Sequence, residues 1–349
     1  MLYESLEIGN PYRKEYIDSL EHTLDKLREA AQERRNELFR KHFPGNAEYI
    51  RSLLREKLGW PLTQSERKIN SVRKEYSGTR TGCSIYRLQY ELTEGIQFYG
   101  ILFVHEDGLR RPLIIAQHGG LGTPEVIGGL LEKGTGNYNC MVERLCELGA
   151  NVFAPQLLLW NPQSLIVREK DAKGDVDSLR RSLDARLQQV GSSMTAIEIH
   201  CISCTIDHLM EEPFSQADHL GMAGLSYGGF YAMYTAAVDT RIRSTLNSCS
   251  FSEGGLGHRA GTDYIWSDSG NYFLDAEVAL LVYPRNLCIQ VAKHDKIIPF
   301  ESSQREYSRF DTMARKLTGN SNWYVLDAFD GEHEFNPDDR YLQWLLDRC

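Results

Sequence analysis

Six short apolar runs, separated by stretches with helical periodicity, limit the folds open to this chain more than any other feature. The runs are PLIIAQH (112–118), ANVFAPQ (150–156), LGMAGLS (220–226), RSTLNSCSF (243–251), LCIQVAKHD (287–295) and WYVLDAF (323–329). Their apolar residues are continuous rather than alternating, which is typical of parallel strands covered by helices on both faces. The sequence therefore predicts an α/β protein with a mostly parallel central sheet.

A helical region precedes these runs. Between residues 11 and 43 apolar residues recur every three or four positions, except where Arg34 takes the expected apolar place; they are Ile17, Leu20, Leu24, Leu27, Ala31 and Leu38. Such a stripe requires a partner surface, on the same chain or on another. A second, shorter helix is expected to end at Gly59 and Pro61.

These patterns give a domain organisation. The segments CSIYRLQYEL (83–92) and IQFYGILFVH (96–105) alternate around a turn and predict an antiparallel hairpin. Residues 1–75 are interpreted as a helical extension that either caps the site or pairs subunits into a homo-oligomer. Residues 76–349 are interpreted as the main α/β domain, with insertions at about 157–193 and 252–280.

The composition argues against several classes of function. The net charge of −9 argues against a general affinity for nucleic acid or an anionic membrane surface. No apolar run approaches the roughly 20 residues that span a bilayer, and the first residues lack the apolar core of a secretory signal. The eight cysteines are read as reduced thiols, so a cytoplasmic location is expected. The pair in HCISC (200–204) lies in a predicted helix, where buried thiols are favoured over a metal or redox site.

The segment Gly-Leu-Ser-Tyr-Gly at 224–228 is the strongest chemical motif. Ser226 ends one apolar run and begins a helical stretch, which is the context that a G-x-S-x-G nucleophile turn requires. Gly224 and Gly228 leave room for a sharp turn that holds the serine hydroxyl outward, with the N-terminus of the next helix aimed at it. Ser226 is the candidate nucleophile.

A serine nucleophile needs a base and a group that orients the base. Among ten histidines, His333 lies in a polar loop directly after the last predicted strand, where α/β sheets carry their chemistry. Asp295 ends the preceding strand. A solvated loop histidine and a turn-capping aspartate are the ordinary alternatives. The order Ser226, Asp295, His333, each following a strand, favours a catalytic triad.

Two backbone amides must also stabilise the oxyanion of the tetrahedral intermediate. One is expected from Tyr227, directly after the nucleophile. The other is expected from the glycine-rich loop AQHGGLGTPE (116–125), with Gly120 favoured and Leu121 as the alternative. His118 is interpreted as a scaffold residue that orders this loop. The chain contains neither of the common phosphate-binding glycine patterns.

With these residues in view, the chain resembles the α/β-hydrolases over roughly residues 80–349. The resemblance rests on the pieces HGG (118–120), GLSYGG (224–229), HDKIIP (294–299) and GEHEF (331–335). Within the superfamily it is most similar to dienelactone-hydrolase-like and acetyl xylan esterase-like bacterial hydrolases. The resemblance implies catalytic roles for the three triad candidates and oxyanion roles for Gly120 and Tyr227. It also implies release of small acyl groups, often acetyl on carbohydrate. Dienelactone hydrolases proper carry cysteine where this chain has serine.

Three functions follow as hypotheses. The first is a serine hydrolase that cleaves a small-molecule carboxylic ester through an acyl-enzyme, without a metal or organic cofactor. The second keeps the triad and changes the bond to C–C or amide. The third is a catalytically silent scaffold that binds a partner. Leu121, Trp160 and Trp266 are candidate substrate contacts, the tryptophans as faces on which a sugar could stack.

Overall fold

The protein is described by a computed structural model that covers residues 3–64, 66–159, 176–253 and 266–349. Within these residues, nine strands form one sheet: β1 (Ile69–Arg80), β2 (Cys83–Leu92), β3 (Gln97–His105), β4 (Arg111–Gln117), β5 (Asn151–Pro155), β6 (Ser215–Leu225), β7 (Ser244–Ser248), β8 (Asn286–Ala292) and β9 (Tyr324–Phe329). The helices are α1 (Asn10–His42), α2 (Ala47–Leu58), α3 (Pro124–Ile127), α4 (Met141–Glu147), α5 (Val176–Gln188), α6 (Met194–Glu211), α7 (Tyr227–Val238), α8 (Ser269–Tyr272), α9 (Asp275–Leu280), α10 (Phe300–Thr318) and α11 (Arg340–Leu346).

The sheet is mixed at one end and parallel through the rest. Its order is β1-β2-β3-β5-β4-β6-β7-β8-β9, with antiparallel pairing from β1 to β5 and parallel pairing from β5 onward. The mostly parallel α/β sheet predicted from the apolar runs is confirmed. In the described parts of the chain, no helix combines the length and apolarity needed to cross a membrane.

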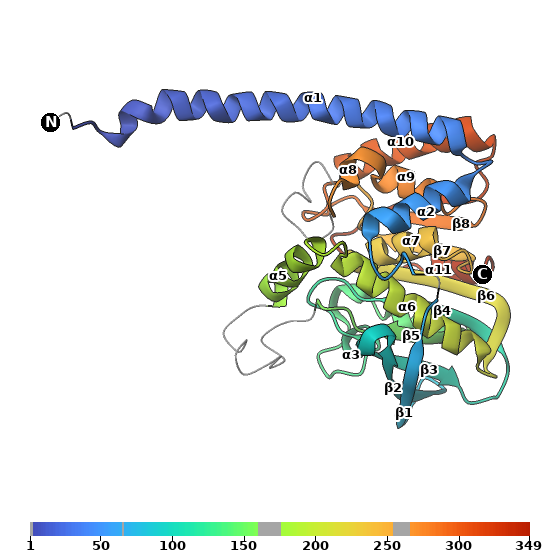
Figure 1. Ribbon diagram of the computed structural model, residues 1–349. Coiled ribbons are helices and arrows are strands. Elements are labelled where there is room, and N and C mark those ends of the chain that lie inside the picture. The colour runs from blue at the N-terminus through green and yellow to red at the C-terminus, as the bar shows by residue number, and fades with distance from the viewer. Residues whose placement is uncertain (1–2, 65, 160–175, 254–265) are drawn as a thin grey trace.

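Helices cover both faces of this sheet (Figure 1), which explains why its central strands are apolar throughout. Along β4, Leu113 and Ile115 point to one face, whose core is completed by α2, α6, α7, α9 and α10. Ile114 and Ala116 point to the other face, against α3, α4 and α11. Successive side chains of a strand alternate between faces, so every residue of this strand segment is buried.

The N-terminal region is joined to the sheet more closely than expected. The sequence boundary at residue 75 falls inside β1, an edge strand whose side chains are mostly exposed and which therefore lacks the alternation that reveals a strand. Helix α2 also belongs to the body, because Ile50, Leu54 and Leu58 are buried in the main core. Residues 1–75 thus contain the first part of one strand and one whole helix of the α/β body.

Helix α1 behaves differently along its length. Its buried residues are Ala31, Arg35 and Phe39, whereas the part before them extends from the body, with the N-terminus at the far end (Figure 1). The buried part packs against α8, where Phe39 meets the ring of Phe273 edge-on at 6.4 Å. Only the last third of α1 is therefore attached to the body.

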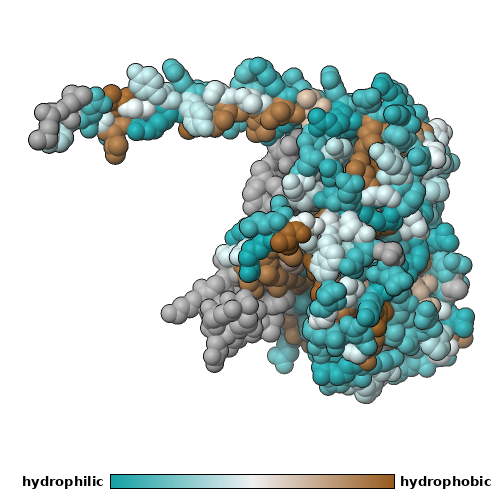
Figure 2. All heavy atoms as spheres, in the orientation of Figure 1, coloured by the Kyte–Doolittle hydropathy of each residue, from teal (hydrophilic) through white to brown (hydrophobic). Residues whose placement is uncertain are grey.

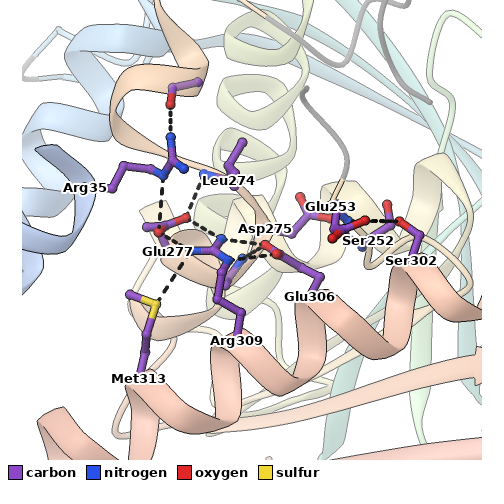
Figure 3. Close-up of polar contacts among 12 residues, drawn as sticks. Arg35, Ser252, Glu253, Leu274, Asp275, Glu277, Ser302, Glu306, Arg309 and Met313 are labelled. Atoms are coloured by element: carbon purple, nitrogen blue, oxygen red, sulfur yellow. Dashed lines mark hydrogen bonds and ion pairs between the residues drawn. The ribbon is translucent and has the colours of Figure 1, made fainter. Parts of the chain in front are cut away.

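A buried polar network holds this attachment (Figure 3). The Arg35 guanidinium lies 3.5 Å from Glu277 and donates to the Gly270 carbonyl. Arg309 of α10 pairs with the same Glu277 at 2.8 Å and with Glu306 at 2.7 Å. Buried carboxylates are tolerated when they are paired in this way. The network therefore ties α1 to α9 and α10.

The same network reaches the predicted insertion at 252–280. Asp275 accepts a hydrogen bond from the Ser252 amide at 3.1 Å, so the two ends of this segment are held together. The other predicted insertion, 157–193, ends in α5, which packs on α6. Both segments follow carboxyl ends of strands, β7 and β5.

Replacement of Leu54 by alanine tests whether α2 is part of the core. Leu54 is fully buried, so the Leu54→Ala variant should lose about 2–5 kcal/mol of the free energy of unfolding. The control Leu109→Ala removes a side chain that is 61% exposed and should change stability by less than about 0.5 kcal/mol. Urea unfolding followed by circular dichroism measures both. Equal stabilities would show that α2 is a detachable appendage.

Candidate active site

Ser226 stands at a strained turn between β6 and α7. Its backbone angles are φ 58° and ψ −122°, which a residue with a side chain adopts only when its surroundings impose them. The Ser226 amide donates to the Ser248 carbonyl of β7 at 2.8 Å, and the Ser226 carbonyl begins α7 by accepting from Phe230 at 3.0 Å. The turn thus fixes the serine at the carboxyl edge of the sheet, at the N-terminus of α7.

The glycines on either side of Ser226 make this turn possible. A Cβ atom on Gly224 would lie 2.3 Å from the carbonyl carbon of Gly228, and one on Gly228 would lie 2.2 Å from the Gln117 oxygen. Real Cβ atoms do not approach backbone this closely, so both positions require glycine. The close approach brings the start of α7 against the end of β4.

Asp295 and His333 form a hydrogen-bonded pair at the same edge. The Asp295 Oδ2 atom lies 2.7 Å from His333 Nδ1, and the other carboxylate oxygen accepts from the amides of Ile297 and Ile298, each at 2.8 Å. The carboxylate side chain is 2% exposed and the imidazole 14%. Because an ionised carboxylate only accepts, Nδ1 carries the hydrogen and Nε2 remains as the acceptor of the ring.

The end of β7 brings Ser226 and the His333 loop to one place. Ser248 holds the Ser226 amide, and the next residue, Cys249, contacts the Glu334 carbonyl through its Sγ at 3.3 Å. The described structure contains no hydrogen bond between the Ser226 hydroxyl and the His333 ring. Such bonds are often long before substrate binds. The structure therefore brings the two loops together, while the Ser226 hydroxyl and the His333 ring are not in hydrogen-bond contact.

Two adjacent residues that the sequence did not reveal also connect the loops. Asn137 donates from its side chain to the His333 carbonyl at 3.0 Å. Tyr138 accepts from the Gly119 amide at 2.9 Å, and a Cβ on Gly119 would lie 3.1 Å from the Ser226 Cβ. The short 3₁₀ helix Gly136–Tyr138 therefore fixes the histidine loop and the glycine-rich loop relative to each other.

Hydrogen bonding in the glycine-rich loop distinguishes the two candidate donors to the oxyanion, Gly120 and Leu121. The Leu121 amide donates to the Leu159 carbonyl at 2.7 Å, so it is engaged within the protein. Gly120, by contrast, has no hydrogen-bond acceptor for its amide among the described residues. A Cβ on Gly120 would lie 3.6 Å from the Tyr227 ring, which places this glycine beside the first residue of α7. The geometry favours Gly120 over Leu121.

His118 holds the glycine-rich loop in place through hydrogen bonds of its ring. Its ring is fully buried, with Nδ1 2.8 Å from the Gly119 carbonyl and Nε2 2.9 Å from the Leu157 amide. Since an amide N–H donates to Nε2, the hydrogen of the neutral ring sits on Nδ1. Burial lowers the pKa of His118 to about 4. His118 is therefore a neutral hydrogen-bonding bridge between the loop and the residue that follows β5.

A cavity of about 950 Å³ opens beside the same loop. Its wall includes Leu121, Val126, Leu157 and Ile197, with Lys133 as a cationic side chain. Cavities of this size and largely apolar lining accept small-molecule ligands. Of the three expected substrate contacts, Leu121 lines the cavity.

Trp266, the second expected contact that the structure describes, does not line the cavity. Trp266 is 5% exposed and packs edge-on against Tyr234 at 5.6 Å, so it is a core residue rather than a stacking face for sugar. Trp160 lies outside the described residues. The pair Cys201 and Cys204 is buried within α6, as expected for structural thiols. No cluster of side chains suited to a metal ion occurs among the described residues.

A buried ion pair fixes α5 above the nucleophile turn. Arg180 contacts both carboxylate oxygens of Glu198 at 2.8 Å and donates to the Tyr231 hydroxyl at 2.7 Å. Its guanidinium lies 5.7 Å from the centre of the Tyr227 ring. Although burial opposes ionisation, Arg180 holds the pKa of Glu198 below its usual range. The residue after Ser226 is thus covered by a helix anchored on α6 and α7.

Alanine substitutions at two glycines test the close approach of α7 and β4. Gly228→Ala should lower the free energy of unfolding by roughly 1–3 kcal/mol, or prevent folding, because its Cβ meets the Gln117 carbonyl. Gly120→Ala serves as the control and should fold with nearly unchanged stability, since its Cβ finds ordinary contact distances. Thermal unfolding compares the variants. Normal stability of Gly228→Ala would contradict the described packing.

Comparisons with known proteins agree with this architecture. No family model matches the chain. A provisionally named hydrolase, YtaP of Bacillus subtilis (strain 168), is 28% identical over 121 residues, which are 32% of this chain and 39% of that protein.

Solved structures match over most of the chain. A provisionally assigned acetyl xylan esterase from Bacteroides fragilis NCTC 9343 has a TM-score of 0.63 at 12% identity, covering 86% of this chain and 81% of that one. A glucuronoyl esterase from Solibacter usitatus has a TM-score of 0.60 at 14% identity, covering 86% and 91%. Acetyl xylan esterase 1 from Thermoanaerobacterium sp. JW/SL YS485 has a TM-score of 0.54 at 14% identity, covering 88% and 94%. The sheet order, the serine turn and these likenesses together identify the fold of this chain as that of the α/β-hydrolases.

Proposed function

We propose that the protein is a serine hydrolase of carboxylic esters, with Ser226 as nucleophile, His333 as general base and Asp295 as the group that orients the base. One observation carries the proposal: a strained serine turn lies at the same sheet edge as a buried aspartate–histidine pair. The Asp295–His333 distance of 2.7 Å and the positive φ of Ser226 support it. A silent scaffold would have no need of either feature.

The reaction follows from the positions of these groups. His333 Nε2 takes the proton of the Ser226 hydroxyl as the serine oxygen attacks the ester carbonyl carbon. The amides of Tyr227 and Gly120 stabilise the negative charge on the carbonyl oxygen. His333 then protonates the leaving alcohol, and the acyl group stays on Ser226 until water, activated by the same imidazole, releases the acid. No metal or organic cofactor takes part in these steps.

We propose a small acyl group, such as acetyl on a carbohydrate, as the substrate class. Likeness to two acetyl xylan esterases supports the acetyl group, whereas likeness to a glucuronoyl esterase, whose acyl group is a sugar acid, supports only a carbohydrate ester. Hydrolysis of a C–C or amide bond would use the same three side chains, but those likenesses do not favour it. The cavity beside Leu121 is lined by neither Ser226 nor His333, so Leu121 is its one link to the proposed site among the described residues. A cytoplasmic location is part of the proposal, since all eight cysteines, each among the described residues, are free thiols.

Replacement of Ser226 tests the nucleophile. The wild-type protein should react with a serine-directed fluorophosphonate and hydrolyse p-nitrophenyl acetate, and Ser226→Ala should lose the label and roughly 10⁴–10⁶ of kcat. Ser77→Ala changes an exposed serine of β1 and should match wild type. An unlabelled but folded wild type would favour the scaffold.

A substrate panel separates the ester hypothesis from its alternatives. It contains acetylated xylo-oligosaccharides, methyl glucuronate esters, β-diketones and anilides. Turnover of the last two classes without any ester turnover would overturn the proposed reaction while leaving the triad in place.

Replacement of Asp295 tests the orienting role. Asp295→Asn keeps an acceptor for the Ile297 and Ile298 amides but no longer fixes Nδ1–H, so kcat should fall by roughly 10³–10⁴ with little change in KM. Asp330→Asn is the matched control, because this exposed carboxylate contacts only His294 among the described side chains. Its activity should equal that of wild type. Similar kcat values for the two variants would remove Asp295 from the mechanism.

A further inference from the structure

The outer part of α1 exposes an apolar surface that no described part of the body covers. The residues before Ala31 extend over about 30 Å, at 1.5 Å per residue. Ile17, Leu20, Leu24 and Leu27, which we call the arm stripe, are 58%, 50%, 39% and 62% exposed. Figure 2 shows hydrophobic residues along this projecting helix. An apolar stripe of this kind on a helix normally faces a packing partner.

The arm stripe is continuous with the attached part of the same helix. Ala31 follows Leu27 by four positions and is buried. The heptad-like spacing therefore runs from a covered region into an uncovered one, without a change of face. Among the described residues, the body covers this face of α1 from Ala31 onward, where α8 packs on it, and leaves the arm stripe uncovered.

The spacing of the arm stripe indicates what kind of surface packs on it. Its residues are separated by three, four and three positions, which reads the same in both directions along the helix. A two-fold axis through the midpoint of the stripe, near residue 22, would place Ile17 against the partner's Leu27 and Leu20 against the partner's Leu24. Each side chain of similar volume then packs between those of the other helix. Such a surface is self-complementary and closes at two copies.

The segment before the stripe lies outside this pairing. Exposed apolar side chains continue toward the N-terminus, namely Tyr3 (83%), Leu6 (80%), Ile8 (56%) and Tyr12 (73%). In an antiparallel pair centred near residue 22 these residues would lie opposite residues 32–41 of the partner's α1, where the partner's own body covers the helix, so they add nothing to the interface. The four side chains of the arm stripe expose on the order of 100 Å² each, together about half of the roughly 800 Å² per partner of a standard interface, which is the size of a weak, reversible dimer.

We propose that two copies of this chain form a homodimer through antiparallel pairing of their α1 helices along the arm stripe. The two α/β bodies lie at opposite ends of the paired helices. The pairing also gives the isolated outer half of α1 the tertiary contacts that a helix in water needs for stability.

Charge substitutions in the stripe test the interface in the full-length protein. Sedimentation or light scattering of wild type should give about twice the chain mass of 39.9 kDa. Leu20→Glu/Leu24→Glu should give the single mass, because buried carboxylates without partners would separate the helices. Ser19→Glu/His22→Glu adds the same charge on the opposite helix face and should remain dimeric. Circular dichroism and an unchanged unfolding midpoint of the body verify that each variant folds.

Cysteine cross-linking tests the orientation. In a Cys140→Ser background, which removes an exposed native thiol, Leu20→Cys and Leu24→Cys are made as separate proteins and also co-expressed. Antiparallel pairing predicts disulfide-linked dimers chiefly in the co-expressed sample, whereas parallel pairing would link each variant to itself. A monomeric wild type, a Leu20→Glu/Leu24→Glu dimer, or efficient self-linking of Leu20→Cys would each overturn the proposal.

Discussion

The close contact between α7 and the end of β4 is the constraint on which the candidate active site depends. The strained backbone of Ser226 persists because Gly228 lies directly on the Gln117 carbonyl and Ser248 holds the Ser226 amide. A strained residue costs about 1–3 kcal/mol and must be imposed by its surroundings. Here the surroundings are three parallel strands in fixed register, β4, β6 and β7, so the rigidity of the sheet is transmitted to one hydroxyl group.

The loops around this turn are assembled by contacts that lie far apart in sequence. Asn137 reaches the His333 loop, Tyr138 reaches Gly119, and His118 reaches the residue after β5. None of these contacts involves a charged group, so the loops are positioned by neutral hydrogen bonds, of which those of Tyr138 and His118 are buried and that of Asn137 is exposed. Such bonds are directional and are costly to leave unmade when buried. They fix the geometry without adding charge next to the candidate oxyanion amides.

The central sheet could be predicted because its strands are apolar on both sides and separated by helices. Positions after successive strands could likewise be assigned to Ser226, Asp295 and His333, whose catalytic roles stay predictions. Strand β1 could not be found, because an exposed edge strand such as INSVRKEYSGTR carries no apolar alternation. Asn137 and Tyr138 gave no signal either, since their partners are chosen by the tertiary fold. Trp266 shows the opposite failure: an aromatic residue in a predicted insertion packs in the core.

The charges at the root of α1 determine how far this protein can be shortened. Glu277 is fully buried, and although burial opposes it, Arg309 and Arg35 hold its pKa below the usual range. A fragment that begins after His42 would lack Arg35. The guanidinium of Arg309 would then be the one remaining ion-pair partner of both Glu277 and Glu306 in this network. Because burial already raises the pKa of Glu306, that carboxyl would be the one to take up a proton unless water entered the core. The long helix is therefore not a removable tag on an independent enzyme, and a minimal version of the protein would need a neutral residue in place of Glu306.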